Sequence, residues 1–251
     1  MELIPIPAAE VATLAVAALL TSILSAVVGM AGGIVLLTVM LLFLPPLVVI
    51  PLHGVVQLVS NGSRTFIQRG HLRTDLIWRY AVLLLPMGFV GLQIAQRLPE
   101  AAITLLIGVF VLVATWAPSA LMLGAHPEQT NPRRRFFFLG GVTGLLNITL
   151  GATGPLIAPF FLNLGLTRFQ LIGTKAASQM LGHLAKLVVF GVAGFAYIEW
   201  LGLLGILAAC VIAGTWLGSQ LLERVNEQWF VRIYKTVLSL IAIRLIGSTL
   251  L

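Results

Sequence analysis

Two stretches of the sequence carry ionisable and amide side chains at helical spacing inside otherwise apolar runs. The positions are four, four and three residues apart in both stretches, so each set falls on one face of a helix. Polar groups are costly in hydrocarbon, and we therefore expect both faces to line a protein interior or a wet cavity. The residues are His53, Gln57, Asn61 and Arg64 in the first stretch, and Lys175, Gln179, His183 and Lys186 in the second.

The charges in these two stripes indicate the ligand. Arg64, Lys175 and Lys186 are cationic, and neither stripe contains a carboxylate. A cation pathway or a carboxylate proton relay would need Asp or Glu in the membrane interior, so the sequence favours an anion as ligand. The alternative is structural, because amide and imidazole groups also hold neighbouring membrane helices together.

The composition places these helices in a membrane. Of 251 residues, 59% are apolar and only 9% are charged, and the mean hydropathy is +1.05. A soluble domain carries about 25% charged residues. A soluble enzyme, a nucleic-acid-binding module and a secreted disulfide scaffold are therefore excluded, and loop arginines that orient membrane helices account for most of the net charge of +7. About 20 apolar residues make one crossing, which predicts seven or eight helical segments. The apolar runs are 8–44, 49–68, 75–97, 101–123, 136–164, 170–197, 200–222 and 228–250.

Two of these runs contain glycine-rich interruptions. The run 8–44 is too long for a single crossing, and its excess centres on residues 29–33, Gly-Met-Ala-Gly-Gly. The run 136–164 contains residues 151–155, Gly-Ala-Thr-Gly-Pro, which are also poor helix formers. We predict two broken or re-entrant helices whose freed N–H groups bind substrate oxygens. A close helix crossing and a simple proline kink are the structural alternatives. The candidate ligands at the breaks are Gly32, Gly33, Thr153 and Gly154.

The two halves of the chain match one another. A shift of 122 residues brings both glycine motifs and both polar stripes into register, with Gln57 on Gln179. We therefore predict an all-α polytopic membrane protein of two homologous four-segment repeats, residues 1–123 and 136–251, joined by a cytoplasmic linker at 124–135. Parallel repeats would divide the arginines considered seven against four between the two sides, and inverted repeats nine against two. The inverted arrangement fits the cytoplasmic excess of Lys and Arg better, and we favour it.

The glycine motifs also carry a family resemblance. Residues 28–33, Val-Gly-Met-Ala-Gly-Gly, recur as residues 150–155, Leu-Gly-Ala-Thr-Gly-Pro, and residues 173–178, Gly-Thr-Lys-Ala-Ala-Ser, follow. Over nearly its whole length the chain resembles the sulfite exporter TauE/SafE family. The resemblance implies a multi-pass carrier of the bacterial inner membrane that exports sulfite, sulfonates or related sulfur-containing anions. Thr153 and Pro155 depart from the commoner glycine-rich pattern.

These observations predict a secondary active transporter that binds a small anion between the repeats. Arg64, Lys175 and Lys186 would supply charge, and the amides and His183 would orient oxygens, with protons as the coupling ion. The rival hypotheses are an anion channel, a carrier of another organic anion such as a carboxylate, and a purely structural membrane subunit. We expect no enzymatic activity, cofactor, metal or nucleic-acid partner, because no catalytic motif or ligand-like histidine spacing is present. The sequence does not indicate an oligomeric state.

Overall fold

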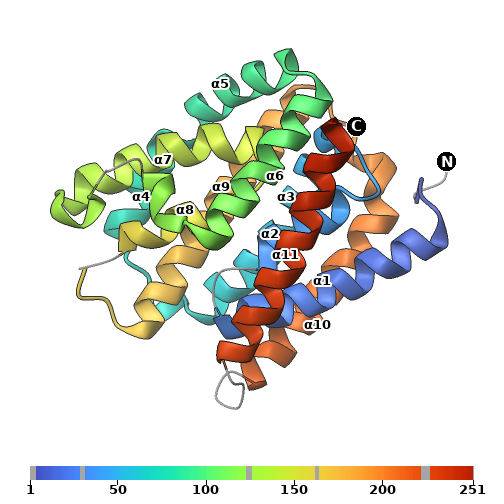
Figure 1. Cartoon of the computed structure of the whole chain (residues 1–251). Coiled ribbons are helices and arrows are strands. Elements are labelled where there is room, and N and C mark those ends of the chain that lie inside the picture. Colours follow the sequence, from blue (N-terminus) through green and yellow to red (C-terminus); the bar gives the residue numbers. More distant parts are fainter. Residues whose placement is uncertain (1–3, 29–31, 123–125, 162–163, 222–226, 251) are drawn as a thin grey trace.

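The computed structural model describes residues 4–28, 32–122, 126–161, 164–221 and 227–250, and within these ranges the chain is helical and contains no strand. Short 3₁₀ turns connect several of the α-helices (Figure 1). The α-helices are α1 (Ala8–Val28), α2 (Gly32–Met40), α3 (Pro46–Ile67), α4 (Thr74–Val82), α5 (Leu84–Arg97), α6 (Glu100–Trp116), α7 (Pro132–Thr149), α8 (Gly154–Ile157), α9 (Arg168–Val192), α10 (Leu201–Leu221) and α11 (Glu227–Leu250).

The distribution of side chains is the reverse of that in a soluble protein. Large apolar residues are exposed on many helices, among them Leu20 (57%), Leu240 (64%) and Trp216 (61%). Conversely, ionisable side chains such as Lys186 (0%) and His53 (1%) are buried. A lipid environment explains both observations, because hydrocarbon solvates apolar surface and excludes polar groups.

In the part of the chain that the structure describes, two helices are long and apolar enough to cross a membrane by length and composition alone, at Ala8–Ala26 and Tyr197–Gln220. A third span is added if α4 and α5, which bend by 40° at Leu83, count as one. The number is below the seven or eight predicted segments for identifiable reasons. The polar stripes and terminal charges of α3 and α9 lower their hydropathy, and α6 has only 17 residues.

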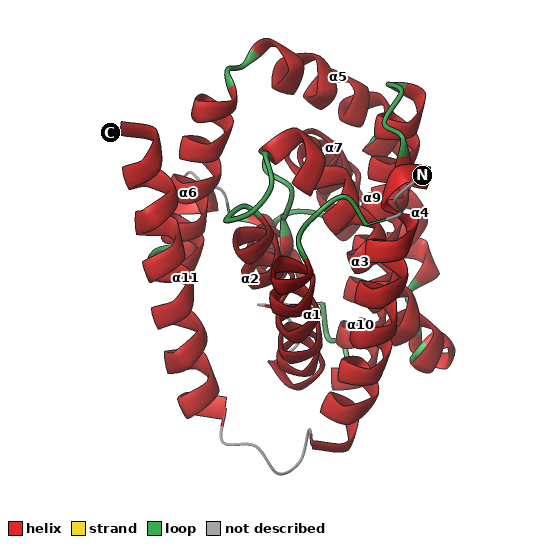
Figure 2. Ribbon diagram, turned by 90° about the vertical axis from the view of Figure 1, so that its right-hand side faces the viewer, coloured by secondary structure: helices red, strands yellow, loops and turns green. Residues whose placement is uncertain are grey.

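The most extensive helix contacts pair segments from the two halves of the chain. α1 packs on α10, α3 on α9, α5 on α7, and α6 on α11 (Figures 1 and 2). Glycines allow several of these helices to approach closely, as small residues do in membrane bundles. A Cβ atom added at Gly144 would lie 2.5 Å from the Leu84 carbonyl oxygen, and one added at Gly218 would lie 2.7 Å from the Ile23 carbonyl oxygen.

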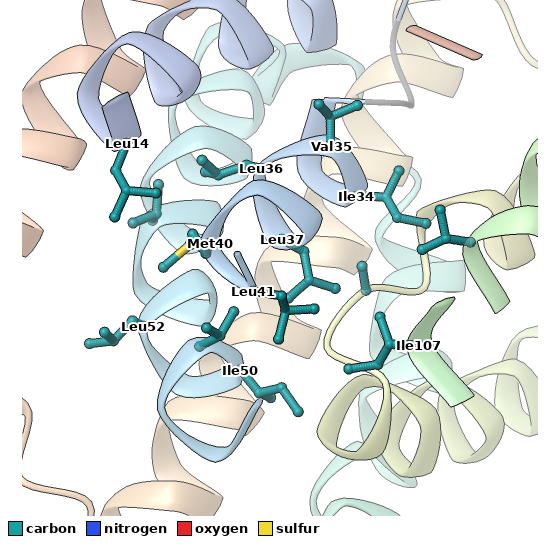
Figure 3. Packing of buried hydrophobic residues seen from close by; sticks show 14 of the residues in the cluster. Leu14, Ile34, Val35, Leu36, Leu37, Met40, Leu41, Ile50, Leu52 and Ile107 are labelled. Carbon is teal, nitrogen blue, oxygen red and sulfur yellow. The ribbon is translucent and has the colours of Figure 1, made fainter. Parts of the chain in front are cut away.

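The short helix α2 lies inside the bundle, between α3 and the α6–α11 pair (Figure 2). Six of its nine residues are buried apolar side chains or a buried threonine, and Leu36, Leu37 and Met40 are almost completely inaccessible. They pack with Ile50 of α3 and belong to the same apolar cluster as Ile107 of α6 (Figure 3). This packing fixes the position of the glycines at the start of α2.

Both glycine-rich segments coincide with helix ends. α1 ends at Val28 and α2 begins at Gly32, while the intervening residues 29–31 lie outside the described residues. α7 ends at Thr149 and α8 begins at Gly154. Between them Gly151 has φ +80°, a conformation that side chains other than glycine rarely adopt. That these segments are re-entrant stays a prediction, as does the division into two repeats; α7 begins at Pro132, inside the predicted linker.

Candidate functional site

The two polar stripes face one another in the structure because α3 packs along α9. Gln57 and Asn61 of α3 are 5% and 1% exposed, and Lys175 and His183 of α9 are 6% and 5% exposed. The opposite side of α9 faces outward, with Leu184 and Val188 exposed, whereas α3 is also buried on its apolar side, at residues such as Ile50. The helical spacing therefore predicted correctly which face of each helix is buried.

A small pocket lies where the stripes meet the two glycine-rich segments. It leaves about 20 Å³ for the centres of water-sized molecules, so in this conformation it is narrow. Its lining combines five helices from both halves of the chain. The lining residues are Ser25, Gly33, Ile34, His53, Gln57, Arg64, Ala152, Thr153, Gly154, Pro155, Gln179 and His183.

Arg64 is the cation that lines this pocket. Its Nη2 donates to Oδ1 of Asn61 at 2.9 Å, and its Nη1 donates to the Ser25 carbonyl at 3.3 Å. Asn61 in turn donates from Nδ2 to the carbonyl of Gln57 at 2.9 Å, which fixes its amide orientation. Asn61 thus holds the guanidinium in place beside the pocket and does not line it.

Two histidines from opposite halves meet at the pocket. The rings of His53 and His183 lie edge to face, with centroids 5.8 Å apart. Nε2 of His53 donates to the Gly33 carbonyl at 2.8 Å, which fixes the imidazole against the start of α2. Nδ1 of His183 is buried and has no hydrogen-bond partner among the described residues. Buried polar atoms are rarely left without partners, so this nitrogen is available to a bound ligand.

The two lysines lie behind the pocket and do not line it. Nζ of Lys186 donates to the Gly151 carbonyl at 2.6 Å, and the side chain passes over Gly54, whose missing Cβ leaves the space. Lys175 is buried on the same helix, close enough to Arg64 for charge repulsion between the two cations. Both lysines place amino groups beside a site of low dielectric constant, where a positive charge acts over a longer range than in water.

The glycines at the first break contact the site in different ways. A Cβ at Gly33 would lie 3.0 Å from Oε1 of Gln57, so this glycine lets the amide reach the pocket. A Cβ at Gly32 would collide with the carbonyl oxygen of Thr21 and with Oγ of Ser25, so that glycine serves the close approach of α1 and α2. In this conformation the breaks present carbonyls to the site, as Gly33 and Gly151 do, in addition to any free N–H groups.

The structure thus brings eight of the twelve predicted site residues to one pocket, namely Gly33, His53, Gln57, Arg64, Thr153, Gly154, Gln179 and His183. The other four, Gly32, Asn61, Lys175 and Lys186, are buried around it. Ser25 lines the pocket and was not predicted. The one sequence signal for Ser25 was its alignment with Asn147, which places a polar residue in an apolar run of each half.

The electrostatic character of this interior is cationic. Among the residues whose burial is described, no Asp or Glu is buried, whereas Lys175, Lys186 and Arg135 are. The described residues also contain no group of three or more His, Cys, Asp or Glu side chains arranged to hold a metal ion. The arrangement can therefore attract and hydrogen-bond a small anion.

An all-helical bundle with an apolar exterior and a buried cationic pocket defines a membrane protein that handles anions. The family model for the sulfite exporter TauE/SafE matches residues 14–245. The chain belongs to this family, a family of membrane transporters for sulfite-like anions. No curated protein and no solved structure matches the chain.

Proposed function

We propose that the protein is a secondary active carrier that exports small sulfur-containing anions, such as sulfite or an organosulfonate, across the bacterial inner membrane. One observation carries the proposal: two facing polar stripes place Arg64, Lys175 and Lys186 around a buried pocket. No Asp or Glu is buried among the residues whose burial the structure describes. A small oxyanion matches this chemistry because its oxygens accept only, while the site offers guanidinium, imidazole and amide donors.

The contacts of the site suggest a division of labour. Arg64 and the ring of His183 face the pocket and would contact the oxygens directly, with Gln57 and Gln179 orienting them. Lys175 and Lys186 would compensate the anion's charge from behind, and Asn61 would position the guanidinium. The Thr153–Gly154 segment would offer N–H groups at the start of α8.

The contacts between halves support the proposed internal repeat. A shift of 122 residues takes Ile23 to Leu145, and a shift of 127 takes Gly91 to Gly218. Gly91 packs against the Leu145 backbone, and Gly218 packs against the Ile23 backbone. Each contact therefore joins the residues that are equivalent, under the proposed repeat, to those of the other contact. A second pair behaves in the same way. Leu19 contacts Gly214, and the equivalent residues Gly141 and Met87 are also in contact.

The direction of packing supports inverted repeats. If α3 and α9 are equivalent, parallel repeats would place them in the same direction and inverted repeats in opposite directions. Their contacts run antiparallel, because partners of increasing number on α3 have decreasing number on α9. The equivalent pair α6 and α11 is also antiparallel. The contacts are Gly54–Lys186, Gly62–Met180 and Gln68–Gly173 for the first pair, and Gly108–Ile246 and Trp116–Ser239 for the second.

The arginine-rich segments lie at one end of the bundle. The His71 ring stacks on Phe169 with centroids 5.5 Å apart, and the backbone N–H of Arg73 donates to Thr174 at 3.0 Å, which joins the α3–α4 loop to the start of α9. Arg79 of α4 and Arg133 of α7 line the same surface cavity, so the start of α7 lies at this end as well. We propose that this end, hereafter the arginine end, faces the cytoplasm.

The narrow pocket supports a carrier over an open channel. A conducting pore needs a continuous water-filled path, whereas this pocket has space for about one water. We further propose protons as the coupling ion, with the adjacent rings of His53 and His183 as the groups that carry them, because imidazole is the side chain that changes charge near neutral pH.

Equilibrium binding tests the proposal. Purified protein should bind sulfite or a short alkanesulfonate with higher affinity than a carboxylate of the same size, as measured by thermal shift and calorimetry. Equal stabilisation by all anions would reduce the site to a nonspecific cationic patch. Stabilisation by none of the sulfur anions would refute the proposed substrate class.

A further inference from the structure

A second polar cluster lies outside the pocket, between α4, α7 and α9. Tyr80 is 0% exposed, Thr143 is 1% exposed and Asn147 is 3% exposed. The Tyr80 Oη, Thr143 Oγ1 and Asn147 Oδ1 atoms have no hydrogen-bond partner of good geometry among the described residues. Among the described residues, the hydroxyls of Tyr80 and Thr143 have only each other as partners, and Asn147 Oδ1 has none. A buried polar cluster of this kind is unusual, because each group carries a desolvation cost.

These three side chains converge on Gly182 of α9. A Cβ atom at Gly182 would lie 3.4 Å from Nδ2 of Asn147, 3.4 Å from Oη of Tyr80 and 3.8 Å from Cγ2 of Thr143. The hydroxyls of Tyr80 and Thr143 are also close enough to interact. The space above Gly182 is thus bordered by two neutral polar groups, the Asn147 amide and the Tyr80 hydroxyl, and by the Thr143 methyl group. It has room for little more than a methyl group.

The cluster lies next to the pocket, on the side of α9 that faces α4 and α7. Gly182 precedes His183, which lines the pocket. α4, α7 and α9 all begin at the arginine end, and on α7 the buried polar positions Arg135, Thr143 and Asn147 are eight and four residues apart. At 1.5 Å per residue they span about 18 Å along one side of the helix. Buried polar groups therefore continue from that end toward the pocket.

The surface at the arginine end attracts anions. A cavity of about 630 Å³ includes Arg134 and Arg135 in its lining, and a neighbouring cavity of about 360 Å³ includes Arg79, Arg133 and Arg134. The nearby acidic groups are already paired. Arg73 donates two hydrogen bonds of 2.9 Å to Asp75 and so lowers the pKa of that carboxyl, and Glu128 lies 3.2 Å from His126. Positive charge gathered around these two cavities raises the local concentration of anions.

We propose that Tyr80, Thr143 and Asn147 form a polar constriction through which the anion passes between the arginine end and the pocket. The proposal rests on the proposed function. The three neutral side chains hydrogen-bond the anion in transit without holding it, since they add no charge that would trap it. Buried polar groups are retained there at a cost in stability because passage needs them.

The first test separates transport from stability. Tyr80→Phe removes one hydroxyl of the constriction, so the maximal transport rate in proteoliposomes should fall about ten-fold. The melting midpoint should fall no further than in Thr143→Val, which breaks the same hydroxyl pair from the other side, and the binding affinity for an alkanesulfonate should not change. Tyr197→Phe is the matched control, because its hydroxyl donates to the Leu187 carbonyl outside the constriction, and it should leave transport unchanged.

Two results of this test would overturn the proposal. One is full transport by Tyr80→Phe. The other is a loss of transport that follows a larger fall in the melting midpoint than in Thr143→Val, which would make the cluster structural. If the wild type itself transports no sulfur anion, the proposed function fails, and the second test still decides whether anions reach the constriction.

The second test uses thiol reagents of opposite charge. Gly182→Cys in a Cys210→Ser background should react at least ten-fold faster with sulfonatoethyl methanethiosulfonate than with its trimethylammonium analogue. Isethionate should slow the reaction. Thr143→Cys replaces this variant if Gly182→Cys does not fold. Equal rates with both reagents, or no reaction with either one, would refute an anion path at this position.

Discussion

Replacing Arg64 by methionine should weaken anion binding by roughly ten- to a hundred-fold. Arg64 is the cation that lines the pocket, and the guanidinium is held there by Asn61 at 2.9 Å and by the Ser25 carbonyl at 3.3 Å. A charge-assisted hydrogen bond of this kind contributes about 1.5–3 kcal/mol, and each 1.4 kcal/mol is about a factor of ten in affinity. Methionine keeps an unbranched apolar stem and removes the charge and all donors.

The variant also leaves the Asn61 Oδ1 atom without its donor. A buried acceptor without a partner costs about 1–3 kcal/mol, so a lower melting midpoint is expected and must be separated from binding. Titration of the folded variant with an alkanesulfonate by calorimetry gives the affinity directly. Arg69→Met is the matched control, since it makes the same change in net charge at an exposed residue that stacks on Phe66.

Two results would refute this reasoning. An unchanged affinity in folded Arg64→Met would remove the guanidinium from the site. An equal loss in Arg69→Met would show that net charge, and no specific contact, governs binding.

Three further predictions concern packing, topology and coupling. Gly140→Ala should lower the melting midpoint strongly, because the new Cβ would collide with the Tyr80 carbonyl oxygen, whereas Gly205→Ala, with no atom within 4 Å, should be neutral or stabilising; equal midpoints would refute the close α4–α7 contact. Gly70→Cys and Gly165→Cys in a Cys210→Ser background should both resist impermeant thiol reagents in intact cells, and labelling of Gly165→Cys alone would favour parallel repeats. His183→Gln should still transport but no longer respond to an imposed pH gradient in proteoliposomes, and a full response would exclude His183 from proton coupling.

The sequence alone was sufficient to predict which residues face inward. Three- and four-residue spacing assigned His53 and His183 to buried faces, because the helix repeat is the same in every environment. Spacing along a helix does not show, however, which residues of a buried face line a pocket. It therefore could not predict that Asn61 and Lys186 lie behind the pocket.

Contacts between distant segments were less predictable. Tyr80 was missed because it stands on α4, outside both stripes, and reaches Gly182 of α9 only through the packing of α4 on α9. Asn147 was visible as a polar residue in an apolar run, but its partners come from α4 and α9. Helix pairing depends on glycine contacts at a few positions, and the spacing of residues along one helix does not encode it.

Counterflow in proteoliposomes tests the central claim most directly, since it separates a carrier from a channel and from a structural subunit. Vesicles loaded with unlabelled sulfonate should take up labelled sulfonate transiently above its equilibrium level, with saturable kinetics, and Arg64→Met should lose this overshoot while Arg69→Met keeps it. Uptake that rises linearly with concentration and shows no overshoot in the wild type would contradict a carrier, and so would the absence of any flux.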